Sequence, residues 1–336
     1  MDRENYLPSR GSSLSIGTCN GNEDATILLT KVKTFHSMMS DQTAERGSES
    51  SDEVVRRGVI LSVGGGVTAL DWCPSPNQQN QFLAVSCARN LCTLHSVYVP
   101  ECQKNCLQIW RITGMEKNAS ETDVVYGSSL STPLSAAMSF CIASELDGAS
   151  ALAWCPDGWI SKSEGNMGRM GLLAAVHESG DICVYSVPHE EDTNSRAQSN
   201  TQSETPNCIR LKFQSMSTSA KKPTCISWSK DPSRRFLAAG YSDGHVACWK
   251  VEDNIEGPNS AIFLGRITPD HIVSIDFDPF CPYVFATASL NTNFLKLWDM
   301  RIGPTYLSTC AVAGHMWPNQ IMWSKPDWIM YSTAEG

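Results

Sequence analysis

Four cysteines in the first third of the chain are close enough in sequence to suggest a metal site. A histidine lies among them, and the order is Cys87, Cys92, His95, Cys102 and Cys106. Thiolate and imidazole are zinc ligands, but structural zinc sites usually pair them as two C-x2–4-C motifs. The spacings here fit only loosely, and the intervening sequence TLHSVYV is typical of a strand. We therefore predict that the chain has no metal site. The residues that would be the candidates for binding zinc are Cys87, Cys92, Cys102 and Cys106.

Other residues with catalytic potential have simpler structural explanations. Three glycines at 64–66 precede a predicted strand, but no Gly-Lys-Ser/Thr sequence follows, so we interpret them as a turn and not as a phosphate-binding loop. The seven histidines form no H-x-x-x-H pair. His245 follows Asp243 and Gly244 in a predicted turn, which accounts for all three residues. We therefore predict that the chain is not an enzyme, binds no cofactor and has no small-molecule substrate.

The elements that would position these residues are short strands in a repeated block. Three apolar runs lie between residues 224 and 249, and a Ser-Asp-Gly sequence ending at Gly244 predicts a tight turn between the second and third runs. Three strands cannot bury their own faces, so a stable fold needs further copies. Copies occur at 68–110, 149–185 and 272–298, and residues 319–323 open a fifth.

An aromatic residue closes the first and the third strand of each complete copy. Phe277 follows Trp228 by 49 residues and Trp323 follows Phe277 by 46, near the roughly 40–45-residue period of a WD40 blade. We predict that these aromatics pack between neighbouring blades. Together with a turn aspartate and the Trp-Asp dipeptide, the structural repeat positions are Trp72, Trp110, Trp154, Tyr185, Trp228, Asp243, Trp249, Phe277, Trp298, Asp299 and Trp323.

The repeat predicts an all-β fold, a WD40-like β-propeller over residues 58–336. Trp154 follows Trp72 by 82 residues and Trp228 follows Trp154 by 74, so the first blades carry insertions. We expect an incomplete ring, with about four and a half blades present of an expected seven. The loop insertions are predicted near 88–106, 113–147 and 188–222.

Residues 1–57 are predicted to be a mostly disordered segment, because they are polar and poor in apolar periodicity. Residues 26–35 (TILLTKVKTF) are the exception, and we expect a strand there. Such a strand could close the ring by pairing with the last blade, which would remove an exposed sheet edge. A short amphipathic helix is the alternative.

Composition and charge argue against two classes of partner. The chain has 336 residues, 41% of them hydrophobic and 18% charged, which is enough for a packed core. Its longest apolar run, 170–176, is far shorter than the ~20 residues that span a bilayer, so we expect no membrane partner. The net charge is −9, and we expect DNA contact only indirectly, through partners. Fourteen cysteines without a secretory signal indicate free thiols in a reducing compartment.

Several segments resemble the WD-repeat subunit of general transcription factor IIIC. That subunit belongs to the subcomplex that binds the B-block promoter of RNA polymerase III genes. The resemblance covers most of residues 58–336, and its most specific features are the Leu-Asp-Trp-Cys-Pro sequence at 70–74 and the Val-Pro-His sequence ending at His189. The segments that carry it are 64–74, 107–110, 171–189, 236–249 and 294–301.

The resemblance implies a non-catalytic scaffold in the nucleus, supporting assembly on the internal promoters of tRNA and similar genes. Its partners would be other subunits of that factor, especially the largest, DNA-contacting one. This chain lacks the long N-terminal extension of that family and stops within a fifth blade, so we expect a fragment. The alternative is a WD-repeat adaptor elsewhere, such as a ubiquitin-ligase substrate receptor or a trafficking coat. Trp159, Trp317 and Trp328 lie off the repeat positions and are aromatic candidates for an interface.

Overall fold

In the computed structural model of the chain, every regular element in the described residues is a β-strand. The described residues are 13–16, 25–28, 33–39, 54–61, 63, 66–74, 80–88, 105–114, 135–144, 146, 148–160, 168–189, 208–211, 222–231, 235–251, 261–311, 317–324 and 330–335. No helix within those ranges is long and apolar enough to cross a membrane.

Four antiparallel sheets of four strands follow one another along the chain, and each sheet is one blade. Blade one consists of β5 (Gly66–Trp72), β6 (Asn80–Ala88), β7 (Asn105–Thr113) and β8 (Ser135–Ser144). Blade two consists of β9 (Ala149–Trp154), β10 (Arg169–His177), β11 (Ile182–Pro188) and β12 (Cys208–Leu211). In both blades the strands pair in chain order, so each blade is a meander from its inner to its outer strand.

Blades three and four repeat the same meander, and two further strands begin blade five. Blade three consists of β13 (Pro223–Trp228), β14 (Phe236–Tyr241), β15 (His245–Lys250) and β16 (Phe263–Arg266). Blade four consists of β17 (Ile272–Phe277), β18 (Val284–Ser289), β19 (Phe294–Asp299) and β20 (Tyr306–Ala311). Blade five has β21 (Trp317–Trp323) and β22 (Met330–Glu335) in the described part of the chain.

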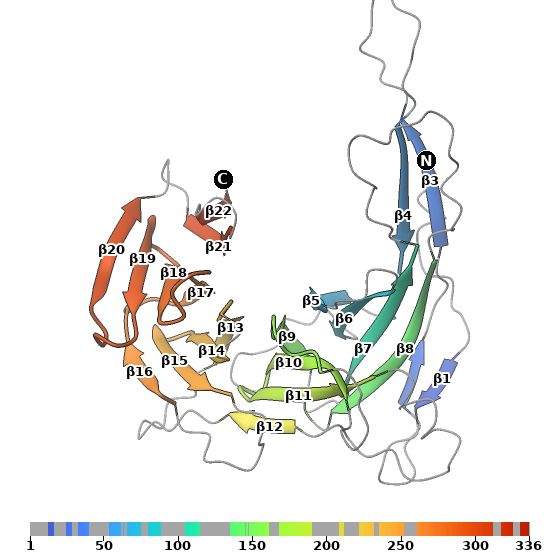
Figure 1. Ribbon diagram of the computed structural model, residues 1–336, viewed down its shortest axis with the longest axis horizontal. Helices are drawn as coiled ribbons and strands as arrows, with labels where there is room; N and C mark the ends of the chain where they lie inside the picture. The colour runs from blue at the N-terminus through green and yellow to red at the C-terminus, as the bar shows by residue number, and fades with distance from the viewer. Residues whose placement is uncertain are drawn as a thin grey trace, which may run out of the picture.

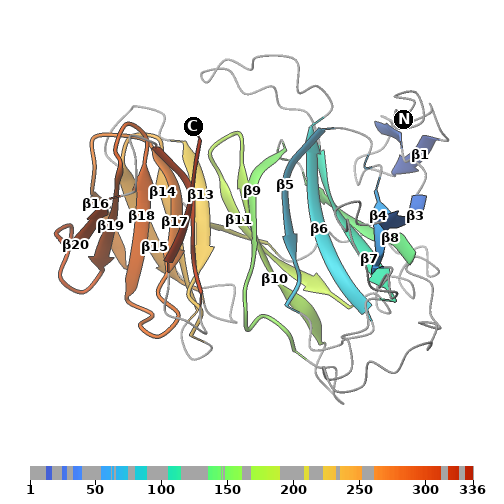
Figure 2. The same ribbon diagram turned by 90° about the horizontal axis from the view of Figure 1, so that it is seen from above.

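The blades are arranged side by side around an axis, as Figures 1 and 2 show. The first strands of consecutive blades, β5, β9, β13, β17 and β21, contact one another in that order and lie innermost. The fourth strands lie on the outside of the array. The structure therefore confirms the predicted all-β propeller of about four and a half blades, arranged as an open arc.

Apolar side chains fill the spaces between blades, because blades two, three and four each have a neighbouring blade on both faces. β10 and β14 are buried along their whole length, which explains their continuous apolar sequences. One apolar cluster joins blades one and two, a second joins blades two and three, and a third joins blades three and four. Trp249, Phe277 and Trp298 are among the largest fully buried side chains. Burial of such aromatics supplies much of the inter-blade stabilisation.

The N-terminal strands differ from the expectation of ring closure. The predicted strand at 26–35 corresponds to β2 (Ala25–Leu28) and the start of β3 (Lys33–Met39). β2 pairs with β1 (Ser13–Ile16), and β3 pairs with β4 (Val54–Ile60), so neither closes the ring against the last blade. β3 and β4 lie beyond blade one, far from β21 and β22 (Figure 1). The prediction of disorder for the rest of 1–57 falls largely outside the described residues and stays a prediction.

The predicted insertions coincide with the gaps between described strands. Two of them also contain an outer strand, β8 within 113–147 and β12 within 188–222. Most of the insertions near 88–106, 113–147 and 188–222 also lie outside them, so their loop character stays a prediction.

A glycine with left-handed backbone geometry closes the β14–β15 hairpin. Gly244 has a φ of 82°, and a Cβ at this position would lie 1.9 Å from the carbonyl oxygen of Thr268. The amides of Ile267 and Thr268 also donate to the Gly244 carbonyl. Blade three therefore requires glycine at this turn both for its backbone angle and for its close contact with the segment that leads to blade four.

We predict that Gly244→Ala lowers the free energy of unfolding by about 3 kcal/mol, because the methyl group meets a backbone atom that cannot move alone. Gly303→Ala is the matched control, since Gly303 has a φ of 96° but no atom within 4 Å of the added Cβ. This control should cost only about 1 kcal/mol of left-handed strain. Urea unfolding followed by circular dichroism measures both, and equal losses would contradict the steric explanation.

Candidate functional site

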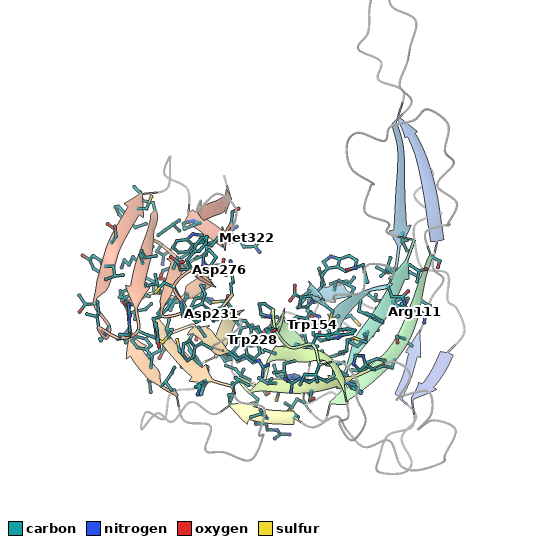
Figure 3. The ribbon with its side chains drawn as sticks, viewed as in Figure 1. Arg111, Trp154, Trp228, Asp231, Asp276 and Met322 are labelled. Carbon is teal, nitrogen blue, oxygen red and sulfur yellow. The ribbon has the colours of Figure 1, made fainter. Side chains whose placement is uncertain are left out.

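A line of polar contacts joins the inner strands of successive blades at one position of the repeat. This position directly precedes the aromatic residue that closes the inner strand, and we call its contacts the inter-blade network. The four residues concerned are Asp71, Ala153, Ser227 and Asp276. Figure 3 shows Trp154, Trp228 and Asp276 along the inner side of the arc.

Asp71 joins blade one to blade two. Its carboxylate accepts a hydrogen bond from the backbone amide of Trp154 at 2.7 Å, and its carbonyl accepts one from the Trp154 indole at 3.2 Å. Burial raises the pKa of the Asp71 carboxyl, whereas the amides of Trp154 and Trp72 lower it. The carboxylate thus supplies an acceptor to an inner-strand amide that would otherwise have none at the end of β9.

Blades two and three are joined by the same kind of contact without a carboxylate. The indole of Trp228 donates to the carbonyl of Ala153 at 2.9 Å. Because a carbonyl is available at every residue, this contact requires only the donor on the following blade. Nearer the start of the inner strands, Thr68 donates to the carbonyl of Ala149 at 2.7 Å and Thr224 donates to that of Ile272 at 2.5 Å.

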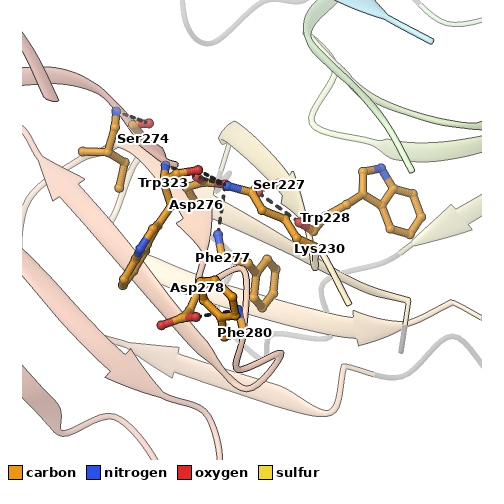
Figure 4. A network of polar contacts seen from close by, with 10 residues as sticks. Ser227, Trp228, Lys230, Ser274, Asp276, Phe277, Asp278, Phe280 and Trp323 are labelled. Carbon is orange, nitrogen blue, oxygen red and sulfur yellow. Dashed lines mark hydrogen bonds and ion pairs between the residues drawn. The ribbon is translucent and has the colours of Figure 1, made fainter. Parts of the chain in front are cut away.

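Asp276 is the centre of the network between blades three, four and five (Figure 4). One carboxylate oxygen accepts hydrogen bonds from Ser227 and from the Phe277 amide, each at 3.0 Å. The other accepts a hydrogen bond from the Trp323 amide at 2.6 Å and forms an ion pair with the Lys230 ammonium group at 2.7 Å. Lys230 also donates to the carbonyl of Trp323 at 2.9 Å. Two side chains therefore connect three blades.

The predicted repeat aromatics lie mostly where the repeat places them, between blades. Trp110, Trp154, Tyr185, Trp228, Trp249, Phe277 and Trp298 are all buried, and Trp323 is partly buried. Trp72 differs, because 43% of it is exposed. The expectation that it packs between blades is wrong in this structure, since no strand of the described part of the chain covers that side of β5.

The two repeat aspartates each stabilise a local turn. Asp243 accepts the backbone amide of His245, and the two side chains also pair at 3.0 Å. Asp299 accepts the backbone amide of Arg301 and pairs with its guanidinium at 2.6 Å. The Arg301 side chain holds the pKa of the Asp299 carboxyl below its usual value and lies over the ring of Tyr283. Turn chemistry therefore accounts for both aspartates.

The zinc candidates are only partly described. Cys87 is the second-last residue of β6 and Cys106 the second residue of β7, so both lie at the same end of blade one. The Cys106 thiol hydrogen-bonds Cys141 of β8. Cys92 and Cys102 lie outside the described residues. Within the described ranges, no group of three His, Cys, Asp or Glu side chains is arranged to hold a metal.

One short sequence pattern associated with nucleophiles lies in the β14–β15 hairpin. Gly240, Ser242 and Gly244 match the G-x-S-x-G spacing of hydrolases, which is followed by a helix in those enzymes. Here a strand follows, and the Ser242 hydroxyl accepts the Lys222 amide at 3.3 Å. The motif is therefore a hairpin turn and not a nucleophile elbow.

An exposed apolar strip lies on β5 and contains the most exposed tryptophan among the described side chains of the inner strands. It consists of Val67, Leu70 and Trp72, which we call the β5 face. Their cross-strand partners on β6 belong to an apolar cluster of blade one that also contains Val63, with Leu61 packed against it. The candidate Trp159 instead lies against His189 with ring centroids 4.7 Å apart. No side chain of Trp317 or Trp328 is described.

The sequence analysis did not single out Asp71, Lys230 or Asp276. For Asp71 and Asp276, the sequence signal is their place directly before the closing aromatic residue, where two of the four complete blades carry aspartate. Lys230 gives no comparable signal, because its partners come from two other blades.

We predict that Asp276→Ala destabilises the fold by about 3 kcal/mol, because it leaves a partly buried lysine and three other donors without their acceptor. Lys230→Met should cost about 1 kcal/mol or less, since its ammonium group is partly exposed and its stem can still pack. Urea unfolding midpoints measure the difference. Equal losses for the two variants would show that the ion pair, and not the acceptor for three donors, is the main contribution.

Comparisons with known proteins agree with this fold. No family model matches the chain. It is 26% identical over 272 residues to General transcription factor 3C polypeptide 2 of Homo sapiens and of Pongo abelii. The match covers 72% of this chain but 28% of each relative, so the chain spans less than a third of their length.

Among solved structures, the chain superposes on Sqt1 from Chaetomium thermophilum with a TM-score of 0.53 at 12% identity, over 92% of this chain and 62% of the other. For Sqt1 bound to the N-terminus of the ribosomal protein L10, the TM-score is 0.52 at 15% identity, over 86% of this chain and 62% of the other. At these identities the likeness shows the fold alone. The chain is a WD40-like propeller, similar in sequence to a subunit of a general transcription factor.

Proposed function

We propose that this chain is a non-catalytic scaffold module of a nuclear transcription factor IIIC complex. In this role the propeller contacts other subunits of the factor, especially the largest, DNA-contacting one, and supports assembly on internal B-block promoters. The main support is the 26% identity over 272 residues to General transcription factor 3C polypeptide 2. That relative is more than three times as long as the matched region, so its partners enter here as proposals.

Two structural features support a role in binding proteins. The inter-blade network connects polar groups of the inner strands to one another, and several large apolar side chains of these strands remain exposed, among them Leu70, Trp72 and Met322. Exposed aromatic and methionine side chains are enriched where proteins bind one another. In addition, Sqt1, which shares the fold, has been seen with the N-terminus of a ribosomal protein bound.

Affinity capture tests the proposed complex. We expect the tagged 336-residue chain, expressed in cells and captured at physiological salt, to recover transcription factor IIIC subunits, with the largest one most enriched. An unrelated propeller of similar size and charge is the control, and mass spectrometry identifies the partners. Recovery of ubiquitin-ligase or coat subunits in place of polymerase III factors would contradict the proposal and favour an adaptor role elsewhere.

We also predict weak, non-specific binding of DNA by the isolated chain. A net charge of −9 repels phosphates, so the dissociation constant for a B-block duplex should be about 10⁻⁶ M or weaker at physiological salt. An electrophoretic mobility shift with B-block and scrambled duplexes of equal length measures this. Nanomolar binding that distinguishes the two sequences would show that the chain itself reads the promoter.

A further inference from the structure

Blade two contains a cluster of thiol, imidazole and phenol groups that the inter-blade network does not use. Cys183 and Tyr185 lie on β11, Cys208 lies on β12, and His177 ends β10. Tyr185 is the cross-strand partner of Cys208, and Cys183 is the partner of Arg210. The two cysteines are therefore diagonal neighbours on one face of the sheet, and their thiols hydrogen-bond each other.

The two thiols differ in their exposure. Cys183 is completely buried, whereas Cys208 is exposed on the outer strand of the blade. A reagent in solution therefore reaches Cys208 first. The buried Cys183 also hydrogen-bonds His177, which in turn lies 3.0 Å from the hydroxyl of Tyr185.

The surroundings of Cys208 favour its ionised form. The Cys183 thiol, the Arg210 guanidinium and the Tyr185 hydroxyl together lower the pKa of Cys208 below its usual value, although partial burial and the Asp181 carboxylate oppose them. The Cys183 thiol acts as the donor of the pair, and its own pKa is raised by the hydrogen bond to Cys208 and by burial. Because thiolate is the nucleophilic and oxidisable form of cysteine, a lowered pKa makes an exposed cysteine more reactive than an ordinary one at the same pH.

A second thiol pair shows why exposure matters. Cys106 on β7 and Cys141 on β8 have the same type of hydrogen bond, which lowers the pKa of Cys141. Cys106 is buried and Cys141 is partly buried beside Met138. Among the cysteines of the described ranges, the Cys183–Cys208 pair is the one that combines a donor thiol in the core with an acceptor thiol at the surface.

We propose that Cys208 is a redox-modification site, which hydrogen peroxide or a similar two-electron oxidant converts to a sulfenic acid, and that Cys183 then forms a reversible disulfide between β11 and β12. In the first step the Cys208 thiolate attacks peroxide, an S–O bond forms, the O–O bond breaks and hydroxide leaves. In the second step Cys183 loses its proton to His177 and attacks the Cys208 sulfur. The S–S bond forms, the S–O bond breaks, and the hydroxide leaves as water with that proton.

The fold allows the small movement that this second step requires. Diagonal partners in an antiparallel ladder have Cα atoms about 7–8 Å apart, slightly more than a disulfide spans. β12 has four residues and, in the described part of the chain, pairs only with β11, so a movement of about 1–2 Å toward β11 breaks no other strand pairing. This movement requires Ile209 and Leu211, which pack in the core, to adjust their contacts. The resulting bond ties the outer strand of blade two covalently to its neighbour.

The first experiment compares reaction rates within one protein. The full chain, purified under reducing conditions, is labelled with iodoacetamide at neutral pH, and peptide mapping follows each cysteine with time. We expect Cys208 to react roughly tenfold faster than Cys310, which is likewise exposed on the outer strand of a blade. Equal rates at the two cysteines would overturn the proposed site.

The second experiment tests the disulfide. After treatment with hydrogen peroxide and blocking with N-ethylmaleimide, we expect a linked Cys183–Cys208 peptide that disappears on reduction. The Cys208→Ser variant should lose it, whereas Cys310→Ser should retain it. In Cys183→Ala, dimedone should trap a sulfenic acid at Cys208. A sulfenic acid at Cys208 of the wild-type protein without any linked peptide would overturn the role of Cys183, and this result does not depend on the folding of a variant.

Discussion

The structure depends on the packing of one blade against the next, because no blade can bury both of its faces alone. Aromatic side chains at the strand ends fill the space between sheets, and polar atoms at the inner strand ends must then find partners across the same boundary. Asp71, Ser227 and Asp276 supply these partners from one position of the repeat. The apolar and polar contacts therefore fix the same spacing between blades, which makes the arc cooperative.

The contacts are not identical from one boundary to the next. Indole nitrogens donate across the boundary at Trp154 and Trp228 but to Thr287 of the same blade at Trp298. In contrast, the indole nitrogens of Trp249 and Trp323 are buried without a hydrogen-bond partner among the described residues. The sequence copies thus differ in which hydrogen bonds their indole groups make at each boundary between blades. The burial of apolar side chains is what all the boundaries share.

The inter-blade network and the thiol cluster are located in different parts of the fold. The network lies along the inner strands, whereas Cys208 lies on an outer strand. Tyr185, which takes the place of tryptophan at its repeat position, connects the two, because its ring packs in the core and its hydroxyl reaches His177 and the cysteine pair. Tyr185 therefore both packs in the core, as its repeat position predicts, and contributes its hydroxyl to the thiol cluster.

The sequence by itself determined the propeller, because strand periodicity and the spacing of Trp154, Trp228 and Phe277 are local properties repeated along the chain. It also placed the turn at Gly244, whose Ser-Asp-Gly sequence is a short-range signal. Tertiary structure alone decided the rest. Lys230 meets Asp276 and Trp323 across two boundaries, Trp72 is exposed because β5 has no neighbour on one side, and Cys183 meets Cys208 through strand register. Contacts between residues distant in sequence leave no periodic signal, so only the folded chain reveals them.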